Sequence, residues 1–428
     1  MEIIVPLFRS FVAALALTAL AACAQTPPAN IAQAQQQARA PVTILISIDG
    51  FRPDYLDRGM TPVLSRLAAE GVRGAMRPAF PSKTFPNHYT LVTGKRPDGN
   101  GIVANKMEDP RRPGEVFTMA SDDPFWWNEA TPIWVDAEKA GVRTATMFWP
   151  GSNVAIGGER APKWPHTISG GTRPSDWQQF NQEISNTQRV NAVADWLRRP
   201  ADIRPRLVTL YFDTVDTAGH TYGPSDPRTL EAVAEVDRHI GALVTTLAEL
   251  GQPANLVFVS DHGMAETSST RTIALDTLLT AGDYRVVEAG PYAALAAMPG
   301  HEAALEAKLL APHPHMQCWR KAEIPARFHY GRNARVPAYL CLAETGWQIT
   351  ERAVSGSFVG GNHGYDHEAA DMAALFVANG PAFRTGASVP TFDNVDIQPL
   401  LARLIGVTPS PGDGSATAFE AVLVSRRN

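Results

Sequence analysis

Three aspartates follow apolar, strand-like runs at widely separated places in the chain. Asp49 ends the run "ISID", Asp216 closes "YFDTVD", and Asp261 stands in "FVSDHG". Each of them alone would be read as a turn or helix-cap residue. In a parallel sheet covered on both faces, however, ligands bind beyond the carboxyl ends of the strands, so we expect the three carboxylates to meet at one edge. Three like charges there would repel each other unless a cation lay between them.

Histidines accompany these aspartates at spacings that suit metal binding. His220 lies four residues after Asp216, His262 directly follows Asp261, and His363 stands in the glycine-rich "GGNHGYDH". A lone histidine is more often structural than a ligand, but three such motifs together favour a metal site. Mixed imidazole and carboxylate ligands favour Zn²⁺ over Mg²⁺. Six candidate ligands suit two ions better than one, and a two-ion cluster suits in-line displacement at phosphorus.

One threonine stands where it could act as a nucleophile. In "KTFPNHYTLVTG", Pro86 falls in the first turn of a predicted helix, which places Thr84 at or just before its amino end. Such a residue can be a simple cap. Beside two metal ions its hydroxyl could instead be held as an alkoxide and attack phosphorus, because the ions and the helix dipole both stabilise negative charge.

Strands and helices alternate around these residues. Apolar, β-branched runs predict strands at 42–49, 143–149, 206–216, 254–263 and 372–380, and amphipathic spacing predicts helices at 61–71 and 228–251. This alternation predicts an α/β fold with a mostly parallel central sheet and helices on both of its faces.

The alternation loosens between Met264 and Gly356, which predicts a small inserted subdomain at 265–355. We expect "GPYAALAAM" and "AALEAKLL" to supply a strand and a helix to it, and the catalytic domain to comprise 41–264 and 356–410. The insert contains Cys318 and Cys341. In an exported protein we expect them to form a disulfide, the alternative being two unrelated buried thiols.

The amino-terminal region predicts export. An apolar run at 11–22 follows Arg9 and is too short to span a bilayer. It ends in "LAAC", which resembles the bacterial lipobox, so we expect a lipoprotein-type signal at 1–23 with a lipid on Cys23; an ordinary secretory signal would also export the protein. Residues 24–40 are rich in Ala, Gln and Pro and predict a flexible tether. The expected location is therefore periplasmic, with a membrane contact only through the lipid anchor.

The overall composition is that of a globular protein. The chain has 428 residues, of which 44% are hydrophobic and 19% charged. Its 38 basic and 43 acidic residues give a net charge of −5, which offers no broad basic field for a nucleic-acid polymer. Any phosphate-bearing ligand must therefore be attracted locally, by a metal or a few oriented donors. We expect the protein to be a monomer.

Several motifs in this order resemble one known family. "IDGFRPDYL", "KTFPNHYTLVTG", "GIVANKM", "DTVDTAGHTYGP", "VSDHGM" and "GNHGYDH" are similar to the nucleotide pyrophosphatase/phosphodiesterase family of the alkaline phosphatase superfamily, in its compact bacterial form. The resemblance runs from about Val42 to Val407. It implies an alkaline-phosphatase-like fold and two Zn²⁺ ions, one bound by Asp216, His220 and His363, the other by Asp49, Asp261, His262 and the nucleophile Thr84.

The resemblance also implies a mechanism and a substrate class. Thr84 would form a covalent phospho-threonine with a nucleotide diester or pyrophosphate, and water would then release the nucleoside 5′-monophosphate. We therefore expect the partners to be small nucleotides. Asn105 and the backbone N–H of Phe85 match the family's pocket for a phosphate oxygen, which acts as an oxyanion hole. Phe85 matches the position that stacks on the base, and Phe180 falls where relatives carry an aromatic residue, although core packing would explain it equally well.

Three other functions remain open from the sequence. A phosphomonoesterase of the same superfamily would need extra cations over the phosphate, for which Arg160 and Lys163 are available. A phospholipid or choline-phosphodiester hydrolase would need an apolar or cation-binding pocket, for which the insert offers aromatic residues, namely Trp319, Phe328, Tyr330 and Trp347. A metal- or nucleotide-binding protein without turnover would use the same ligands but would not need Thr84.

Overall fold

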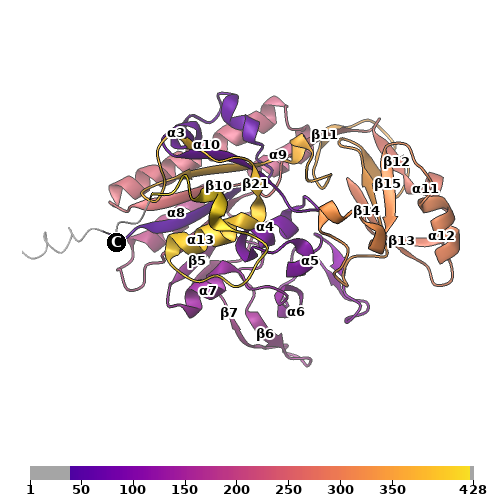
Figure 1. Ribbon diagram of the computed structural model, residues 1–428, viewed down its shortest axis with the longest axis horizontal. Helices are drawn as coiled ribbons and strands as arrows, with labels where there is room; N and C mark the ends of the chain where they lie inside the picture. Colours follow the sequence, from indigo (N-terminus) through magenta and orange to yellow (C-terminus); the bar gives the residue numbers. More distant parts are fainter. Residues whose placement is uncertain (1–38, 425–428) are drawn as a thin grey trace, which may run out of the picture. The chain divides into compact units, whose positions relative to one another are not determined.

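A nine-stranded sheet forms the centre of the molecule (Figure 1). The computed structural model describes residues 39–424. The main path of the sheet runs β20 (Ala387–Ser388), β2 (Val72–Arg77), β19 (Ala374–Asn379), β10 (Ala254–Val259), β1 (Val42–Ile48), β9 (Leu207–Phe212), β5 (Thr144–Met147) and β8 (Asp176–Gln178), with β21 (Phe392–Asp393) also paired to β2. All pairings are parallel except the two made by β19. The predicted mostly parallel sheet is confirmed.

Helices cover both faces of this sheet, as predicted. Alternate residues of β1 serve the two sides: Ile44 and Ile46 belong to one apolar core and Leu45 to the other. The first core is closed by α3 (Pro62–Ala69), α8 (Asn186–Arg198) and α10 (Pro227–Glu249). The second is closed by α4 (Thr84–Thr93), α7 (Ile133–Lys139) and α13 (Ile397–Ile405).

Three features of the sheet region differ from the expectations. Strand β2 was not predicted, because "VRGAMR" has no apolar run; its Gly74 makes room for Val389, whose Cγ1 would lie 2.5 Å from an added Cβ. Strand β19 was predicted, but its antiparallel direction was not. Asp216 does not end a strand: β9 stops at Phe212, and Asp216 lies in the first turn of α9 (Thr214–Tyr222).

The region 265–355 builds a separate antiparallel sheet, on the right of Figure 1. Its order is β13 (Tyr284–Glu288), β14 (Tyr292–Ala297), β16 (Tyr339–Ala343) and β15 (Met316–Arg320), accompanied by α11 (Leu275–Leu278) and α12 (Glu302–Leu309). The expected strand and helix correspond to β14 and α12. Cys318 and Cys341 face each other across β15 and β16 and form a disulfide, as predicted.

The residues between β15 and β16 fasten this sheet to the segment around residues 97–127. Arg335 is fully buried and donates to Asp109 Oδ2 at 2.8 Å, to the Gly101 carbonyl at 2.6 Å and to the Trp126 carbonyl at 2.7 Å. Tyr330 donates to the Val103 carbonyl at 3.0 Å. The chain from Pro41 onward forms one compact unit, so domain boundaries within it stay a prediction.

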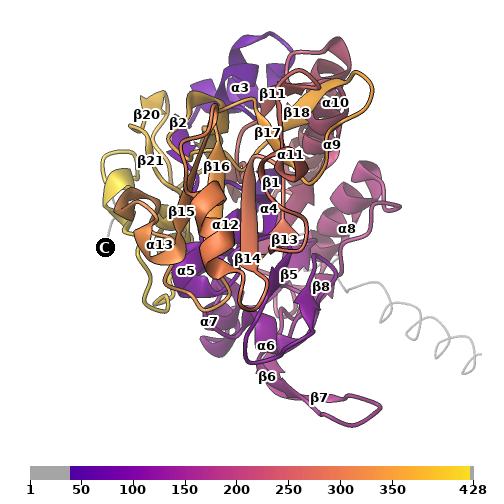
Figure 2. The same ribbon diagram turned by 90° about the vertical axis from the view of Figure 1, so that its right-hand side faces the viewer.

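Shorter elements complete the fold. They are α5 (Pro97–Asn100), α6 (Pro124–Trp127) and the strand pairs β3 (Met107–Glu108) with β4 (Val116–Phe117), β6 (Ile156–Arg160) with β7 (Ile168–Thr172), β11 (Ala265–Ser268) with β18 (Val359–Asn362), and β12 (Thr272–Ala274) with β17 (Gln348–Thr350). The β6–β7 hairpin projects at the bottom of Figure 2. Within residues 39–424, none of the helices has the length and hydropathy that a bilayer-spanning segment requires. Cys23 and the predicted signal lie outside the described residues.

Candidate active site

The predicted ligand residues come from four elements that meet at the carboxyl ends of β1, β9 and β10. Asp49 follows β1, Asp216 and His220 lie one turn apart on α9, Asp261 and His262 follow β10, and His363 follows β18. Four of them are almost fully buried, namely Asp49, Asp261, His262 and His363. Asp216 is partly buried and His220 is exposed. The structure therefore brings together residues that are more than 300 positions apart in the chain.

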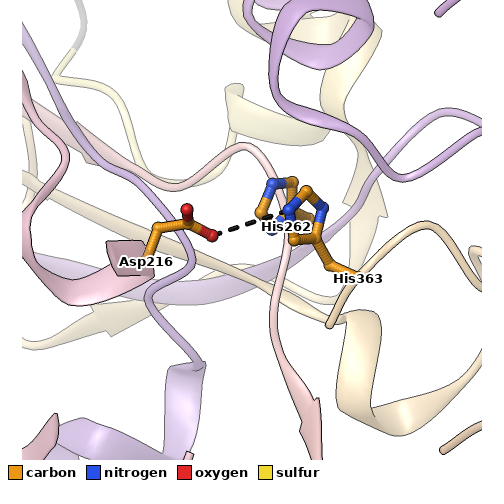
Figure 3. A group of neighbouring side chains, drawn as sticks. All are labelled: Asp216, His262 and His363. Carbon is orange, nitrogen blue, oxygen red and sulfur yellow. Dashed lines mark ion pairs between the residues drawn. The ribbon is translucent and has the colours of Figure 1, made fainter. Parts of the chain in front are cut away.

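Two overlapping groups in this cluster could each hold a metal ion. One comprises Asp216, His262 and His363 (Figure 3), and the other Asp49, Asp261 and His262. The second matches three of the ligands that the family resemblance assigns to one ion. The first contains His262 where the resemblance assigns His220.

His220 is nevertheless part of the cluster. Its Nε2 lies 3.1 Å from His363 Nε2 and 3.5 Å from Asp216 Oδ2. Its Nδ1 is 2.9 Å from the Gly361 carbonyl, as His363 Nδ1 is 2.9 Å from the Ser82 carbonyl. These contacts orient Nε2 of both rings toward Asp216, which is the arrangement that a metal-binding histidine needs.

The acidic oxygens of the site are poorly satisfied by the protein itself. Asp49 Oδ1 and Asp216 Oδ1 are buried without a hydrogen-bond partner among the described residues, and Asp261 Oδ2 contacts the ring nitrogens of His262 at 2.9 Å and His88 at 3.4 Å. A buried carboxylate oxygen left in this way is costly unless a cation meets it. The donor set of carboxylates and imidazoles, with these unpaired oxygens, fits metal ions.

Burial and mutual repulsion perturb the carboxylates. Burial, with Asp261 and Asp216 nearby, raises the pKa of Asp49 well above its usual range. Burial also raises the pKa of Asp216. For Asp261, burial opposes ionisation, but His262 and His88 outweigh it and hold its pKa well below the usual range. Without added positive charge the three carboxylates cannot all ionise easily, which is a further sign of a cation site.

Thr84 is the first residue of α4, as predicted, and its hydroxyl points into this cluster. Thr84 Oγ1 lies 3.4 Å from His262 Nε2, the nitrogen shared by both candidate metal groups. One helical turn further, His88 Nδ1 contacts the Thr84 carbonyl at 2.9 Å and Asp261 Oδ2 at 3.4 Å. The amino end of α4 is thus held against the acidic cluster.

Asn105 and Phe85, which the resemblance assigns to one pocket for a phosphate oxygen, lie next to each other. The Phe85 N–H donates to Asn105 Oδ1 at 3.0 Å. With its oxygen engaged, the Asn105 side chain has its NH₂ group left to donate to a ligand. Both residues line the same cavity.

This cavity has a volume of about 490 Å³ and opens beside Thr84. Its walls include Asp49, Asp216, His220, His363, Phe85 and Phe180, together with Trp127, Phe148, Trp149 and Tyr211. Phe180 is 45% exposed, and its ring centroid lies 5.6 Å from those of Phe148 and Tyr211. It is therefore a wall of the cavity and not ordinary core packing.

Sequence reasoning missed several residues of the site, among them Tyr211 and Lys83. Tyr211 donates to Asp49 Oδ2 at 2.6 Å, and only the folded sheet reveals that contact. Lys83 lines the cavity and is only 8% exposed. Its side chain crosses Gly364, where an added Cβ would lie 2.7 Å from Lys83 Cε. The signal for Lys83 was its place directly before Thr84.

The comparisons with known proteins agree with this geometry. The sequence pattern of the type I phosphodiesterase / nucleotide pyrophosphatase family matches residues 43–366. The chain belongs to this family. A bis(5′-adenosyl)-triphosphatase of Xenopus laevis is 38% identical over 90% of this chain and 82% of its own length. The human ectonucleotide pyrophosphatase/phosphodiesterase family member 5 is 35% identical over 87% of this chain and 76% of its own length.

Solved structures confirm the fold. The structure of human ectonucleotide pyrophosphatase / phosphodiesterase 5 is 33% identical, with a TM-score of 0.83 over 90% of this chain and 100% of that one. The murine protein has been solved as an inactive threonine-to-alanine variant in complex with AMP, also with a TM-score of 0.83. The predicted alkaline-phosphatase-like α/β fold is confirmed, and the chain is a hydrolase of the nucleotide pyrophosphatase/phosphodiesterase class.

Proposed function

We propose that this enzyme cleaves phosphodiester or pyrophosphate bonds in nucleotides through a covalent phospho-threonine at Thr84 and releases nucleoside 5′-monophosphates. One observation carries the proposal. Thr84 Oγ1 stands at the amino end of a helix, on the wall of a cavity, beside the histidine that both candidate metal groups share. The inactive threonine-to-alanine variant of the murine relative, solved with AMP, supports the same role for a threonine.

Two Zn²⁺ ions are proposed as the cofactors. Asp216, His220 and His363 would hold one, and Asp49, Asp261, His262 and Thr84 the other. When bound, such ions supply the positive charge that lowers the pKa of a hydroxyl and offsets the charge of a phosphate.

In the proposed reaction, Thr84, Asn105 and Lys83 have separate roles. Thr84 Oγ1 forms a bond to phosphorus while the bond from phosphorus to the leaving oxygen breaks, and the hydroxyl proton leaves with that oxygen. Water then cleaves the threonine ester, which restores the hydroxyl and frees the monoester. The Asn105 NH₂ group donates to an oxygen of the phosphoryl group, on which negative charge builds up during each step. The Lys83 ammonium, on the same wall, favours substrates with a second phosphate.

The geometry favours diesters over monoesters. Arg160, on the β6–β7 hairpin, pairs with Asp122 at 3.2 Å and does not line the cavity, and neither does Lys163. Arg160 and Lys163 therefore do not supply the cationic pair over the phosphate that a phosphomonoesterase would need.

A choline- or lipid-binding pocket built by the insert is also disfavoured. Phe328 and Tyr330 are buried against Phe80, and Trp347 stacks on His315. Trp319 lines a second cavity of about 670 Å³ at the insert, but none of these four aromatic residues lines the cavity beside Thr84. A small nucleotide is the ligand that the aromatic walls of the cavity fit best.

The proposal is tested by comparing p-nitrophenyl thymidine monophosphate with p-nitrophenyl phosphate, using zinc-loaded protein without the signal. We expect strong preference for the diester, and loss of at least a thousandfold in kcat for Thr84→Ala. Thr245→Ala, on the exposed side of α10, is the matched control and should retain full activity. Dominant monoester turnover would refute the diesterase proposal. Turnover of neither ester by protein with bound zinc would favour a binding protein.

We also propose, from the amino-terminal sequence alone, that Cys23 carries a lipid and holds a monomeric enzyme at the periplasmic side of a membrane. Labelling with a radioactive fatty acid should mark the wild-type protein and not Cys23→Ser. Release of wild-type protein in soluble, unlabelled form would show an ordinary secretory signal instead.

A further inference from the structure

A buried arginine braces one wall of the cavity. Arg189 lies on α8 with its side chain only 2% exposed, and donates to the carbonyls of Ile184 at 3.0 Å and Tyr211 at 3.1 Å. Its guanidinium lies over the rings of Phe148, at 4.9 Å, and Phe180, at 5.7 Å. Phe148 itself has φ of 54°, a conformation that costs an aromatic residue about 1–3 kcal/mol and persists only where the surroundings enforce it. The conformation of this wall is therefore held in place by specific buried contacts.

The same arginine fixes a carboxylate at the cavity. Arg189 Nη1 donates to Asp213 Oδ1 at 2.7 Å, and Asp213 lines the cavity with its side chain 16% exposed. Asp213 Oδ2 accepts from Gln182 Nε2, but at a long 3.4 Å. One oxygen of the carboxylate is thus held rigidly while the other is available to a ligand.

Asp213 gives up a local interaction to take this position. It is the N-cap residue of α9, where an aspartate normally accepts from a backbone N–H of the first turn and contributes about 1 kcal/mol. Here the side chain makes no such bond. An N-cap aspartate whose side chain faces a cavity and makes no capping hydrogen bond is a candidate for ligand recognition.

The position of Asp213 indicates which part of a nucleotide it would meet. It lies three residues before the candidate metal ligand Asp216, which corresponds to about 4.5 Å along the helix axis. In a nucleotide, the sugar is the group next to the reacting phosphate, and the base lies beyond it. Carboxylates accept hydrogen bonds from ribose hydroxyls in other nucleotide sites.

We propose that Asp213 accepts a hydrogen bond from a sugar hydroxyl of the substrate and makes the enzyme prefer nucleotides that carry this hydroxyl, with Arg189 as the residue that positions it. This inference rests on the proposed nucleotide hydrolysis and deepens it.

The test compares four diesters that share a nitrophenol leaving group. They are the p-nitrophenyl esters of adenosine, 2′-deoxyadenosine and 2′,3′-dideoxyadenosine 5′-monophosphate, and bis(p-nitrophenyl) phosphate, which has no sugar. We expect kcat/KM of the wild type to be about tenfold higher for the ribose ester than for the dideoxy ester, the value of a hydrogen bond to a charged group. Asp213→Asn should bring this ratio to within about twofold of unity, with a larger loss for the ribose ester than for bis(p-nitrophenyl) phosphate, which has no sugar.

Controls separate recognition from folding. Asp195→Asn is the matched control, because Asp195 is an exposed aspartate on α8 that also pairs with an arginine, Arg198, at 2.6 Å. This variant should keep the full ratio. Asp213→Glu keeps the charge that Arg189 needs but moves the oxygens by one methylene, so it should remain stable and lose the ratio. Zinc content and thermal unfolding of each variant are measured alongside.

Two outcomes would overturn the inference. One is a ribose preference that survives in Asp213→Asn. The other is an equal fall for all four esters, which would mean that Asp213 acts only through the fold or through Asp216. If the wild type cleaves none of the esters, the proposed function fails, but calorimetric binding of AMP against 2′,3′-dideoxy-AMP by wild type and Asp213→Asn still decides this proposal.

Discussion

Breaking the Cys318–Cys341 disulfide should destabilise the protein by an amount that follows from its place in the chain. The two cysteines are 23 residues apart in sequence. Cross-linking a loop of that length removes about 11 cal/mol/K of conformational entropy from the unfolded chain, which corresponds to about 3 kcal/mol at 25 °C. Reduction restores that entropy without changing the packing of the buried Cys341, so we expect the free energy of unfolding to fall by about 3 kcal/mol.

The assay is urea unfolding followed by tryptophan fluorescence, with oxidised and reduced wild-type protein measured side by side. Cys318→Ala should match the reduced protein and should not respond to reductant. Neither cysteine lines the cavity, so diester hydrolysis at low urea should be unaffected. A difference below about 1 kcal/mol between oxidised and reduced protein would refute the loop-entropy argument.

Three further results are expected. Asn105→Ala should lower kcat for diesters by about a hundredfold or more with zinc content unchanged, as measured by steady-state kinetics. Lys83→Met should lower kcat/KM for ATP about tenfold more than for p-nitrophenyl thymidine monophosphate, and equal losses would contradict a role in phosphate binding. Hydrogen bonding from Arg111, aided by Arg335 against the opposing effect of burial, holds the pKa of Asp109 far below its usual range. Its stabilising effect is therefore present above about pH 4 and lost on acidification, so Asp109→Asn should be less stable than wild type at pH 7 and approach it in acid unfolding.

The parts of the fold that were predictable are those that local sequence determines. The β-branched runs of β1 and β10 and the apolar stripe of α10 are visible because burial on both faces, or on one helical face, leaves a periodic trace. The direction of β19 leaves no such trace, since an apolar strand reads the same whichever way it runs. Strand β2 was hidden because its Gly74 is required by Val389, more than 300 residues away.

The site shows the same division. Asp49, Asp261 and His262 stand in short motifs whose residue types suggest metal binding. His262 belongs to both candidate ligand groups, whereas His220 lies beside His363 without belonging to either, and sequence spacing does not encode that difference. The place of Asp213 at the cavity is invisible in the sequence because Arg189, a residue on another helix, holds its carboxylate there.

The anchoring by Arg335 and Tyr330 limits how this protein can be rebuilt. The peptide between Cys318 and Cys341 supplies donors to backbone carbonyls at positions 101, 103 and 126, on either side of Asn105. A chimaera that takes residues 265–355 from a relative would bring its own anchors to carbonyls whose positions are set by residues 97–127 of this chain. Such a graft should be designed with residues 97–127 from the same donor, as one exchangeable block. Deleting the region would expose those carbonyls and loosen the loop that carries Asn105.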